Sequence, residues 1–251
     1  MKKTVILAVV AVLIVVTNNV NAQNFTLGVK GGISIPNLTA GGTENPINSG
    51  YSSRFGPDYG VFGEYHFSEL FSLSLGLEYS SQGGVKDKFQ AFYTPPEYSS
   101  MVPSEYLYAD FKSEAVMNYI LMPLMVRVGW DLGRRSPWRF NAGVGPFAGY
   151  LLNAKQETSG SSLIYLDETM MVQLPVEAQS FDGTTDIKDQ LNEFNTGVIG
   201  FIGFSYSLAK SSSVFIEGGG NFGFIQIQKN SDNGTNYTGA AVVTIGYAYS
   251  F

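Results

Sequence analysis

His66 is the single histidine of the chain, and histidine is the side chain best suited to acid–base chemistry near neutral pH. A general base also needs a nucleophile and an orienting group within about 3 Å. Ser68 and Ser72 lie close to His66 in sequence, but no triad spacing or nucleophile elbow surrounds them. The chain has no cysteine, so neither a thiolate nucleophile nor a disulfide framework is available. We therefore expect no catalytic residue.

Acidic side chains gather between residues 154 and 193, and oxygen-rich loops of this kind can hold calcium. The segment carries Glu157, Asp167, Glu168, Glu177, Asp182, Asp186, Asp189 and Glu193 against Lys155 and Lys188. The stretch from Asp182 to Asp189 lacks the D-x-D-x-D-G spacing of a calcium-binding loop. A solvated acidic loop is the simpler interpretation, and we expect no metal and no cofactor.

The elements that would position such residues are visible in the last fifteen residues, 237–251. Odd positions from Tyr237 to Phe251 are mostly apolar or aromatic, whereas even positions are mostly small or weakly polar. Because a strand points successive side chains to opposite faces, this strand has one apolar face and one wetter face. The pattern is typical of a membrane β-barrel strand, with lipid outside and a polar lumen inside.

The same alternation predicts eight strands in all. They are Phe25–Ile35, Gly56–Phe67, Phe71–Gly83, Val116–Leu132, Pro137–Asn153, Phe194–Leu208, Val214–Gln228 and Tyr237–Phe251. Connections after the second, fourth and sixth strands are short, and those after the first, third and fifth span about 20, 32 and 40 residues. This predicts an all-β fold, an eight-stranded antiparallel up-and-down transmembrane barrel with short periplasmic turns and long extracellular loops. An apolar island at 163–176 could form one more hairpin and make ten strands, but we expect eight.

Residues 1–22 have the features of a cleaved secretory signal peptide. Lys2 and Lys3 precede an apolar run, and Val20-Asn21-Ala22 forms a small-residue cleavage site. The run is short for the roughly 20 residues that a spanning helix needs. Residues 23–251 would then form the barrel in the cell outer membrane. Without Lys2 and Lys3 the chain keeps 13 of its 15 basic residues against 21 acidic ones, which argues against a nucleic-acid partner.

Six ionisable residues fall on the inward-facing parity of the predicted strands. They are Lys30, Glu64, Glu78, Arg127, Arg139 and Glu217, three cations balanced by three anions. A charge that faced lipid at mid-bilayer would cost roughly 2–4 kcal/mol. We expect Lys30 to lie beside Glu64, and Glu78 beside Arg127. Since side chains can fill an eight-stranded barrel, the set predicts buried salt bridges that plug the lumen. The alternative is a charge-lined path for ions or solutes.

Aromatic residues form two further groups. Outward positions near the strand ends predict membrane-interface girdles made of Trp130, Trp138, Tyr59, Tyr79, Tyr150, Tyr237 and Phe251. The long connection after the third strand carries a second group: Phe89, Phe92, Tyr93, Tyr98, Tyr106, Tyr108 and Phe111. Exposed aromatic patches mark recognition surfaces. This connection is therefore a candidate extracellular recognition loop, and the alternative is self-packing or strand extension.

Two strand sequences resemble the PorT-type outer-membrane β-barrel family. The stretch 118–124 (NYILMPL) and the stretch 141–152 (NAGVGPFAGYLL) are similar to the family's I-P-L strand and its following G-P-x-x-G-Y-L-L strand. Gly28-Val29-Lys30-Gly31-Gly32 is similar to the family's first strand, whereas Asn195-Thr196-Gly197 stands where the family often has D-x-G. The resemblance implies an eight-stranded barrel in a Gram-negative outer membrane. The family's name member is associated with secretion of proteins through the type IX route.

Three functions follow as hypotheses. The first is a non-enzymatic integral outer-membrane protein that acts through its extracellular loops, or as an accessory of secretion or envelope assembly. Its partners would be outer-membrane lipid and other envelope or secretion proteins, and the barrel itself would be monomeric. The second is a narrow pore for ions or small solutes, and the third is a barrel enzyme acting on lipids or peptides. Planar-bilayer conductance separates the first two, and His66→Ala tests the third.

Overall fold

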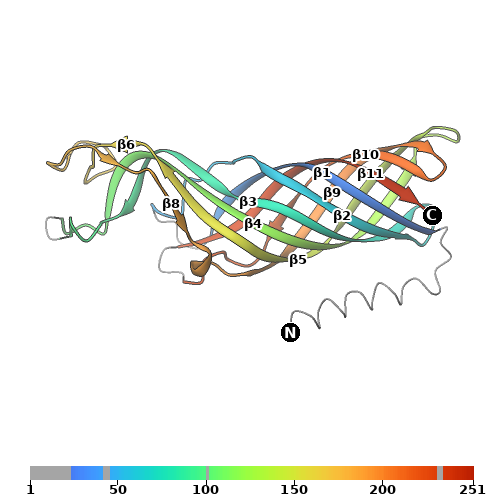
Figure 1. Cartoon of the computed structure of the whole chain (residues 1–251), viewed down its shortest axis with the longest axis horizontal. Coiled ribbons are helices and arrows are strands. Elements are labelled where there is room, and N and C mark those ends of the chain that lie inside the picture. Colours follow the sequence, from blue (N-terminus) through green and yellow to red (C-terminus); the bar gives the residue numbers. More distant parts are fainter. Residues whose placement is uncertain (1–23, 42–45, 100–101, 231–233) are drawn as a thin grey trace.

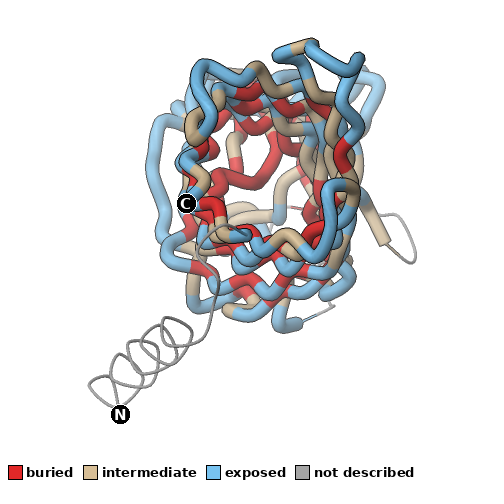
Figure 2. Tube along the Cα trace, turned by 90° about the vertical axis from the view of Figure 1, so that its right-hand side faces the viewer, coloured by how far each residue is buried: buried red, intermediate tan, exposed pale blue. Residues whose placement is uncertain are grey.

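Eight long antiparallel strands close into a barrel in the computed structural model, which describes residues 24–41, 46–99, 102–230 and 234–251. The ring strands are β1 (Phe25–Gly41), β2 (Gly56–His66), β3 (Phe71–Tyr93), β4 (Tyr106–Asp131), β5 (Trp138–Ser159), β9 (Phe194–Ala209), β10 (Ser212–Gly223) and β11 (Thr235–Ser250). Each pairs with its neighbour along the chain, and the β1–β11 and β4–β5 pairings complete the ring (Figures 1 and 2). The predicted fold class is confirmed. The predicted signal peptide lies outside the described residues.

Side chains alternate between the two faces of the ring as the sequence pattern predicts. On β3, Leu75 and Leu77 are 53% and 49% exposed, whereas Ser74 and Glu78 are 0% and 2% exposed. Figure 2 shows buried residues along the inner side of the ring and exposed residues along the outer side. An outer band of exposed aliphatic residues is what lipid contact requires. Among the residues that the structure describes, no helix has the length and apolarity to cross a membrane.

The two ends of the barrel differ in the length of the connections between strands. Short turns after β2, β4 and β9 lie at the end that also holds the C-terminus (Figure 1). There the backbone N–H of Phe251 donates to the carbonyl of Phe25, at 3.0 Å. The start of β1 and the end of β11 therefore lie on the side predicted to be periplasmic, and the long connections lie on the opposite side.

Four strands extend well beyond their predicted bounds on the long-loop side, and the first of them, β1, continues to Gly41 instead of Ile35. β3 continues to Tyr93 instead of Gly83, β4 begins at Tyr106 instead of Val116, and β5 continues to Ser159. Residues 83–93 pair in unbroken register with residues 106–116, so most of the predicted second loop is strand. Aromatic and β-branched residues favour strands, and the aromatic content of this segment accounts for the extension. β10, by contrast, ends at Gly223, before the predicted Gln228.

The third long connection contains short elements outside the ring. β6 (Ser161–Ser162) pairs with β7 (Gln179–Ser180), β8 (Gly183–Asp186) pairs with β5, and the 3-10 helix η2 covers Lys188–Gln190. The apolar island at 163–176 lies within the β6–β7 hairpin. Its residues Ile164 and Leu174 are buried against Leu107 of β4. The island therefore packs on the extended strands, and the ring keeps eight strands.

Candidate functional site: the filled lumen and the extracellular arm

Arg127 on β4 is the centre of an ion-pair group that crosses the lumen. Its Nη2 atom lies 2.5 Å from Oε1 of Glu217 on β10, and its Nε atom lies 3.5 Å from Oε2 of Glu64 on β2. Its guanidinium group also stacks over the ring of Phe201, 4.5 Å from the ring centroid. Because β3 separates β4 from β2, and β5 and β9 separate it from β10, these contacts join strands that are not neighbours in the wall.

Glycine and serine neighbours make room for this group. Gly143 faces Arg127 on β5, and a Cβ atom there would lie only 2.4 Å from the ring of Phe201 and 3.2 Å from Cγ of Arg127. The hydroxyl of Ser72 donates to Oε1 of Glu64, at 2.5 Å. The Glu64 carboxylate thus receives a hydroxyl hydrogen bond in addition to its ion pair, which offsets part of the cost of burying its charge.

A second ion pair joins Lys30 of β1 to Glu78 of β3, with 2.7 Å between Nζ and Oε1. The expected pairing of Lys30 with Glu64 and of Glu78 with Arg127 was wrong. In the observed register Lys30 and Glu78 are both opposite Gly60 of β2, and Glu64 is opposite Thr26. Because Gly60 has no side chain, Lys30 can extend across β2 to the carboxylate beyond it.

Arg139 lies apart from these two groups, at the periplasmic rim. Its Nη1 atom lies 2.8 Å from Oδ1 of Asp131, and its Nη2 atom donates to the carbonyl of Glu69. The Arg139 side chain is 28% exposed, compared with 9% for Arg127. The structure therefore places five of the six predicted lumen charges in buried ion pairs and the sixth at the rim.

Asp58 is a buried lumen charge that the sequence analysis missed. It is 2% exposed and lies on the same parity of β2 as Glu64, so alternation alone could have identified it. A further buried cation, Lys86, lies nearer the extracellular end of β3 and donates to the carbonyl of Ile47. At the level of the two ion-pair groups, four buried carboxylates accompany two cations among the described residues. They are Asp58, Glu64, Glu78 and Glu217, against Lys30 and Arg127. We expected equal numbers of cations and anions, but carboxylates outnumber cations at this level because Asp58 joins the group and Arg139 lies at the rim.

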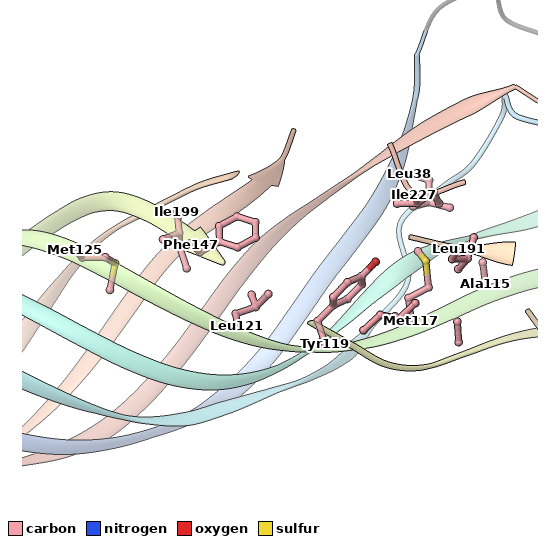
Figure 3. Packing of buried hydrophobic residues seen from close by; sticks show 12 residues of the cluster. Leu38, Ala115, Met117, Tyr119, Leu121, Met125, Phe147, Leu191, Ile199 and Ile227 are labelled. Carbon is pink, nitrogen blue, oxygen red and sulfur yellow. The ribbon is translucent and has the colours of Figure 1, made fainter. Parts of the chain in front are cut away.

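The extracellular half of the lumen is filled by apolar side chains, where we expected a polar lumen. Inward residues of the ring strands form one cluster with loop residues that lie over the mouth (Figure 3). The cluster comprises Leu38, Ala115, Met117, Tyr119, Leu121, Met125, Phe147, Leu151, Ala154, Leu191, Ile199 and Ile227. We call it the apolar seal. The near-continuous apolar run at 119–126 could have indicated it, because a strand with apolar side chains on both faces loses its alternation.

His66 lies at the periplasmic end of β2, close to a hydroxyl group and a carboxylate. Its Nε2 atom is 3.1 Å from the hydroxyl of Thr26 and 3.8 Å from Oε1 of Glu64. Ser68 accepts hydrogen bonds from backbone N–H groups of the following turn, and Ser72 donates to Glu64. Within the described ranges, no group of three or more His, Asp or Glu side chains is placed to hold a metal ion.

The aromatic residues of the candidate recognition loop lie on what we call the extracellular arm, residues 83–93, 106–116 and 160–181. They stack mainly on one another and on aromatic residues of the third connection. The contacts pair Phe89 with Tyr108 and Tyr165, Phe92 with Phe111 and Phe181, Tyr93 with Tyr106, and Phe111 with Phe181, while Tyr98 packs against the Leu107 cluster. Self-packing along an extended strand pair therefore describes most of these side chains.

The end of the β6–β7 hairpin presents apolar residues to solvent on a hydrogen-bonded turn. The Asp167 carboxylate accepts the backbone N–H groups of Thr169, Met171 and Val172, at 2.8, 3.2 and 2.8 Å. The hydroxyl of Thr169 also bonds this carboxylate and holds the pKa of Asp167 below its usual range. Met170 has a left-handed backbone, with φ of 60°. Met170, Met171 and Val172, which we call the tip, are 53%, 85% and 51% exposed.

The predicted interface aromatics lie on the outer face of the barrel. Tyr59, Trp130, Trp138, Tyr150 and Phe251 are exposed, whereas Tyr79 and Tyr237 are half-buried. Tyr79 stacks on Tyr59 with 4.9 Å between ring centroids. Outward rings near both ends of the ring are the arrangement that membrane interfaces favour.

Comparison with known proteins agrees with this architecture. No curated protein sequence matches the chain. Solved structures similar to it include Neisserial surface protein A (11% identity, 90% of this chain and 97% of that one, TM-score 0.43). OprG from Pseudomonas aeruginosa has 11% identity over 91% and 97%, with a TM-score of 0.42, and Ail of Yersinia pestis has 10% over 91% and 99%, with a TM-score of 0.36. Residues 21–238 match the family described as outer membrane protein beta-barrel domain. The chain belongs to this family of outer-membrane barrels.

Proposed function

We propose that this protein is a non-enzymatic outer-membrane barrel that binds a protein partner through its extracellular arm. The partner would belong to a secretion or envelope assembly, as the PorT-like resemblance implies. The observation that carries the proposal is the contrast between the two parts of the molecule. The lumen is filled at two levels, while the arm holds exposed apolar residues on a hydrogen-bonded turn.

The filled lumen favours a binding role over transport. A solute would have to pass the ion pairs of Arg127 and then the apolar seal, which includes Tyr119 and Leu151 at 2% and 0% exposure. Breaking a buried ion pair strands a charge at a cost of about 3–5 kcal/mol. The seal offers no polar replacement for the hydration shell of an ion. A continuous path would therefore need both layers to rearrange together.

The tip has the chemistry of a protein-docking element. Large apolar residues that remain exposed in a cluster commonly mark interaction sites, and methionine adapts its shape to irregular partner surfaces. Asp167 and Glu168 lie beside the tip, and Glu168 accepts a hydrogen bond from the hydroxyl of Tyr108. The complementary surface would therefore be an apolar pocket with a basic rim. Because the turn is already ordered by Asp167, binding would cost little conformational entropy.

The closed lumen leads to a conductance prediction. We expect the purified barrel to give no steady single-channel steps in planar bilayers, because the Arg127 ion pairs and the apolar seal both block the axis. The measurement is a single-channel recording across a range of voltages, with a known porin as the positive control. Reproducible steps of constant size would contradict the closed lumen and favour the pore.

The tip leads to a second prediction. We expect the double substitution Met171→Ser and Val172→Ser to reduce partner recovery at least about tenfold, since losing two buried apolar side chains removes more than 1.4 kcal/mol of binding free energy. The measurement is quantitative pull-down of tagged barrel from detergent-solubilised membranes, after cross-linking in cells. Leu132→Ser is the matched control, because Leu132 is 53% exposed on the opposite, periplasmic side.

The pull-down result separates docking by the tip from other modes of association. Equal recovery with the wild-type tip and with the double variant would contradict docking through the arm. Loss of recovery in Leu132→Ser as well would assign the association to the barrel surface in general. Both variants must first show wild-type amounts of folded protein in the outer membrane.

A further inference from the structure

Asp58 is surrounded by polar groups of three adjacent strands that face the lumen. On β2 it lies opposite Gly32 of β1 and Ser80 of β3. Ser34 and Gln82 each lie two residues further toward the extracellular side on those neighbouring strands, and so on the same inward face. All of these polar side chains are nearly inaccessible: Ser34 is 0%, Asp58 2%, Ser80 0% and Gln82 3% exposed.

Three oxygen atoms of this group have no hydrogen-bond partner among the described residues. They are Oδ1 of Asp58, Oγ of Ser34 and Oε1 of Gln82. The Asp58 carboxylate accepts a hydrogen bond from the Ser80 hydroxyl, and Ser80 also accepts one from Nε2 of Gln82, at 2.9 Å. The hydrogen bond to Ser80 fixes the orientation of the Gln82 amide group, because its nitrogen is the donor. The Gln82 amide oxygen then has no hydrogen-bond partner and can act as a ligand.

The cations close to this group are already paired with other carboxylates: Lys30 with Glu78, and Arg54, which donates to the carbonyl of Gln82, with Glu114. Lys30 already lies 2.7 Å from Glu78, so the local group of Lys30, Glu78 and Asp58 carries a net charge of −1. Arg127 is engaged by Glu64 and Glu217 and supplies no balancing charge. An uncompensated buried carboxylate is expensive. The exposures of 0–3% at Ser34, Asp58, Ser80 and Gln82 show that this site is separated from bulk water.

We propose that the lumen binds one monovalent hard cation at Asp58, with sodium as the physiological candidate. Carboxylate, hydroxyl and amide oxygens are the ligand types that hard cations prefer. One positive charge brings the local sum to zero, whereas a divalent ion would leave an excess of +1. The site involves neither the tip nor the arm, so it stands independently of the function proposed above. Its role is to hold β1, β2 and β3 together inside the bilayer.

The test compares thermal unfolding of the detergent-purified barrel in sodium chloride and in choline chloride at equal ionic strength. Carbon substituents surround the charged nitrogen of choline, so oxygen ligands cannot coordinate it. Choline is also too large for a packed lumen. With sodium at ten times its Kd, we expect the wild-type Tm to be about 3–6 °C higher in sodium than in choline. Asp58→Asn should abolish the difference between the two salts, whatever its effect on absolute stability.

Matched controls distinguish this site from general salt effects. Asp131→Asn changes a carboxylate whose side chain is 64% exposed at the rim, and should retain the sodium effect. Ser34→Ala should weaken it, whereas Ser74→Ala should not, since Ser74 is equally buried with an unpartnered hydroxyl but lies opposite Glu64. Equal Tm values in the two salts would overturn the proposal, as would a sodium effect that survives in Asp58→Asn. A larger response to calcium would overturn the monovalent assignment, and a response to pH alone would assign the charge to a proton.

Discussion

Replacing Arg127 with methionine is expected to destabilise the barrel by about 3–5 kcal/mol, because the change leaves two buried carboxylates without their cation. Glu64 and Glu217 are 9% and 5% exposed, so water cannot replace the lost partner. Methionine keeps most of the aliphatic volume against Phe201, so the effect reports charge rather than packing. The measurement is equilibrium unfolding in urea of barrel reconstituted in lipid vesicles.

Two further variants make the Arg127 result specific. Arg139→Met removes the cation of the partly exposed rim pair with Asp131 and should cost no more than about 1 kcal/mol. Adding Glu217→Gln to Arg127→Met should recover part of the loss, since it removes one of the stranded charges. An equal cost for the Arg127 and Arg139 variants would show that the buried group has no special role.

Leu151→Ala is expected to cost about 2–5 kcal/mol, because it opens a cavity in the apolar seal. Leu151 on β5 is 0% exposed, belongs to the apolar seal and lies opposite Tyr119 of β4, which Figure 3 labels. Side chains from the four ring strands β1, β4, β5 and β9 and the loop residues Leu191 and Ile227 cannot all move inward to fill the space. The same vesicle unfolding experiment measures the loss.

The next residue along the chain is a built-in control for Leu151. Leu152 sits at a β-bulge opposite Asn118 and Tyr119 and is 38% exposed on the outside of the strand. Leu152→Ala should therefore cost less than about 1 kcal/mol, because the lost contacts are with the surroundings rather than with packed side chains. A cost for Leu152→Ala as large as that for Leu151→Ala would contradict a packed seal inside the lumen.

Much of the candidate site was predictable, because strand alternation is a local property. The parity of each strand predicts the inward position of Lys30, Glu64, Glu78, Arg127 and Glu217, and applied without omission it also identifies Asp58. Parity does not say how far along the axis each residue lies, so the sequence grouped Arg139 with the lumen charges, although it lies at the rim.

Strand register, by contrast, decides which charged side chains form ion pairs in the lumen. The sequence led us to pair charges on neighbouring strands, whereas Lys30 crosses β2 at Gly60 and Arg127 crosses the lumen to Glu217. Register is set by hydrogen bonding around the whole closed ring, and a small residue on an intervening strand decides which side chains can meet. Neither the register nor the effect of the intervening residue can be inferred from the sequence of a single strand.

By itself, the sequence determined the strand number, the antiparallel order, the lipid-facing side and the end that carries the long connections. Each of these follows from alternation and from the spacing between apolar segments, which nearby residues encode. Only the tertiary structure decided the ion-pair partners, the apolar seal and the packing of the third connection on the extended strands. These depend on contacts between residues far apart in the chain, such as Leu38 with Ile227, that closure of the ring brings together.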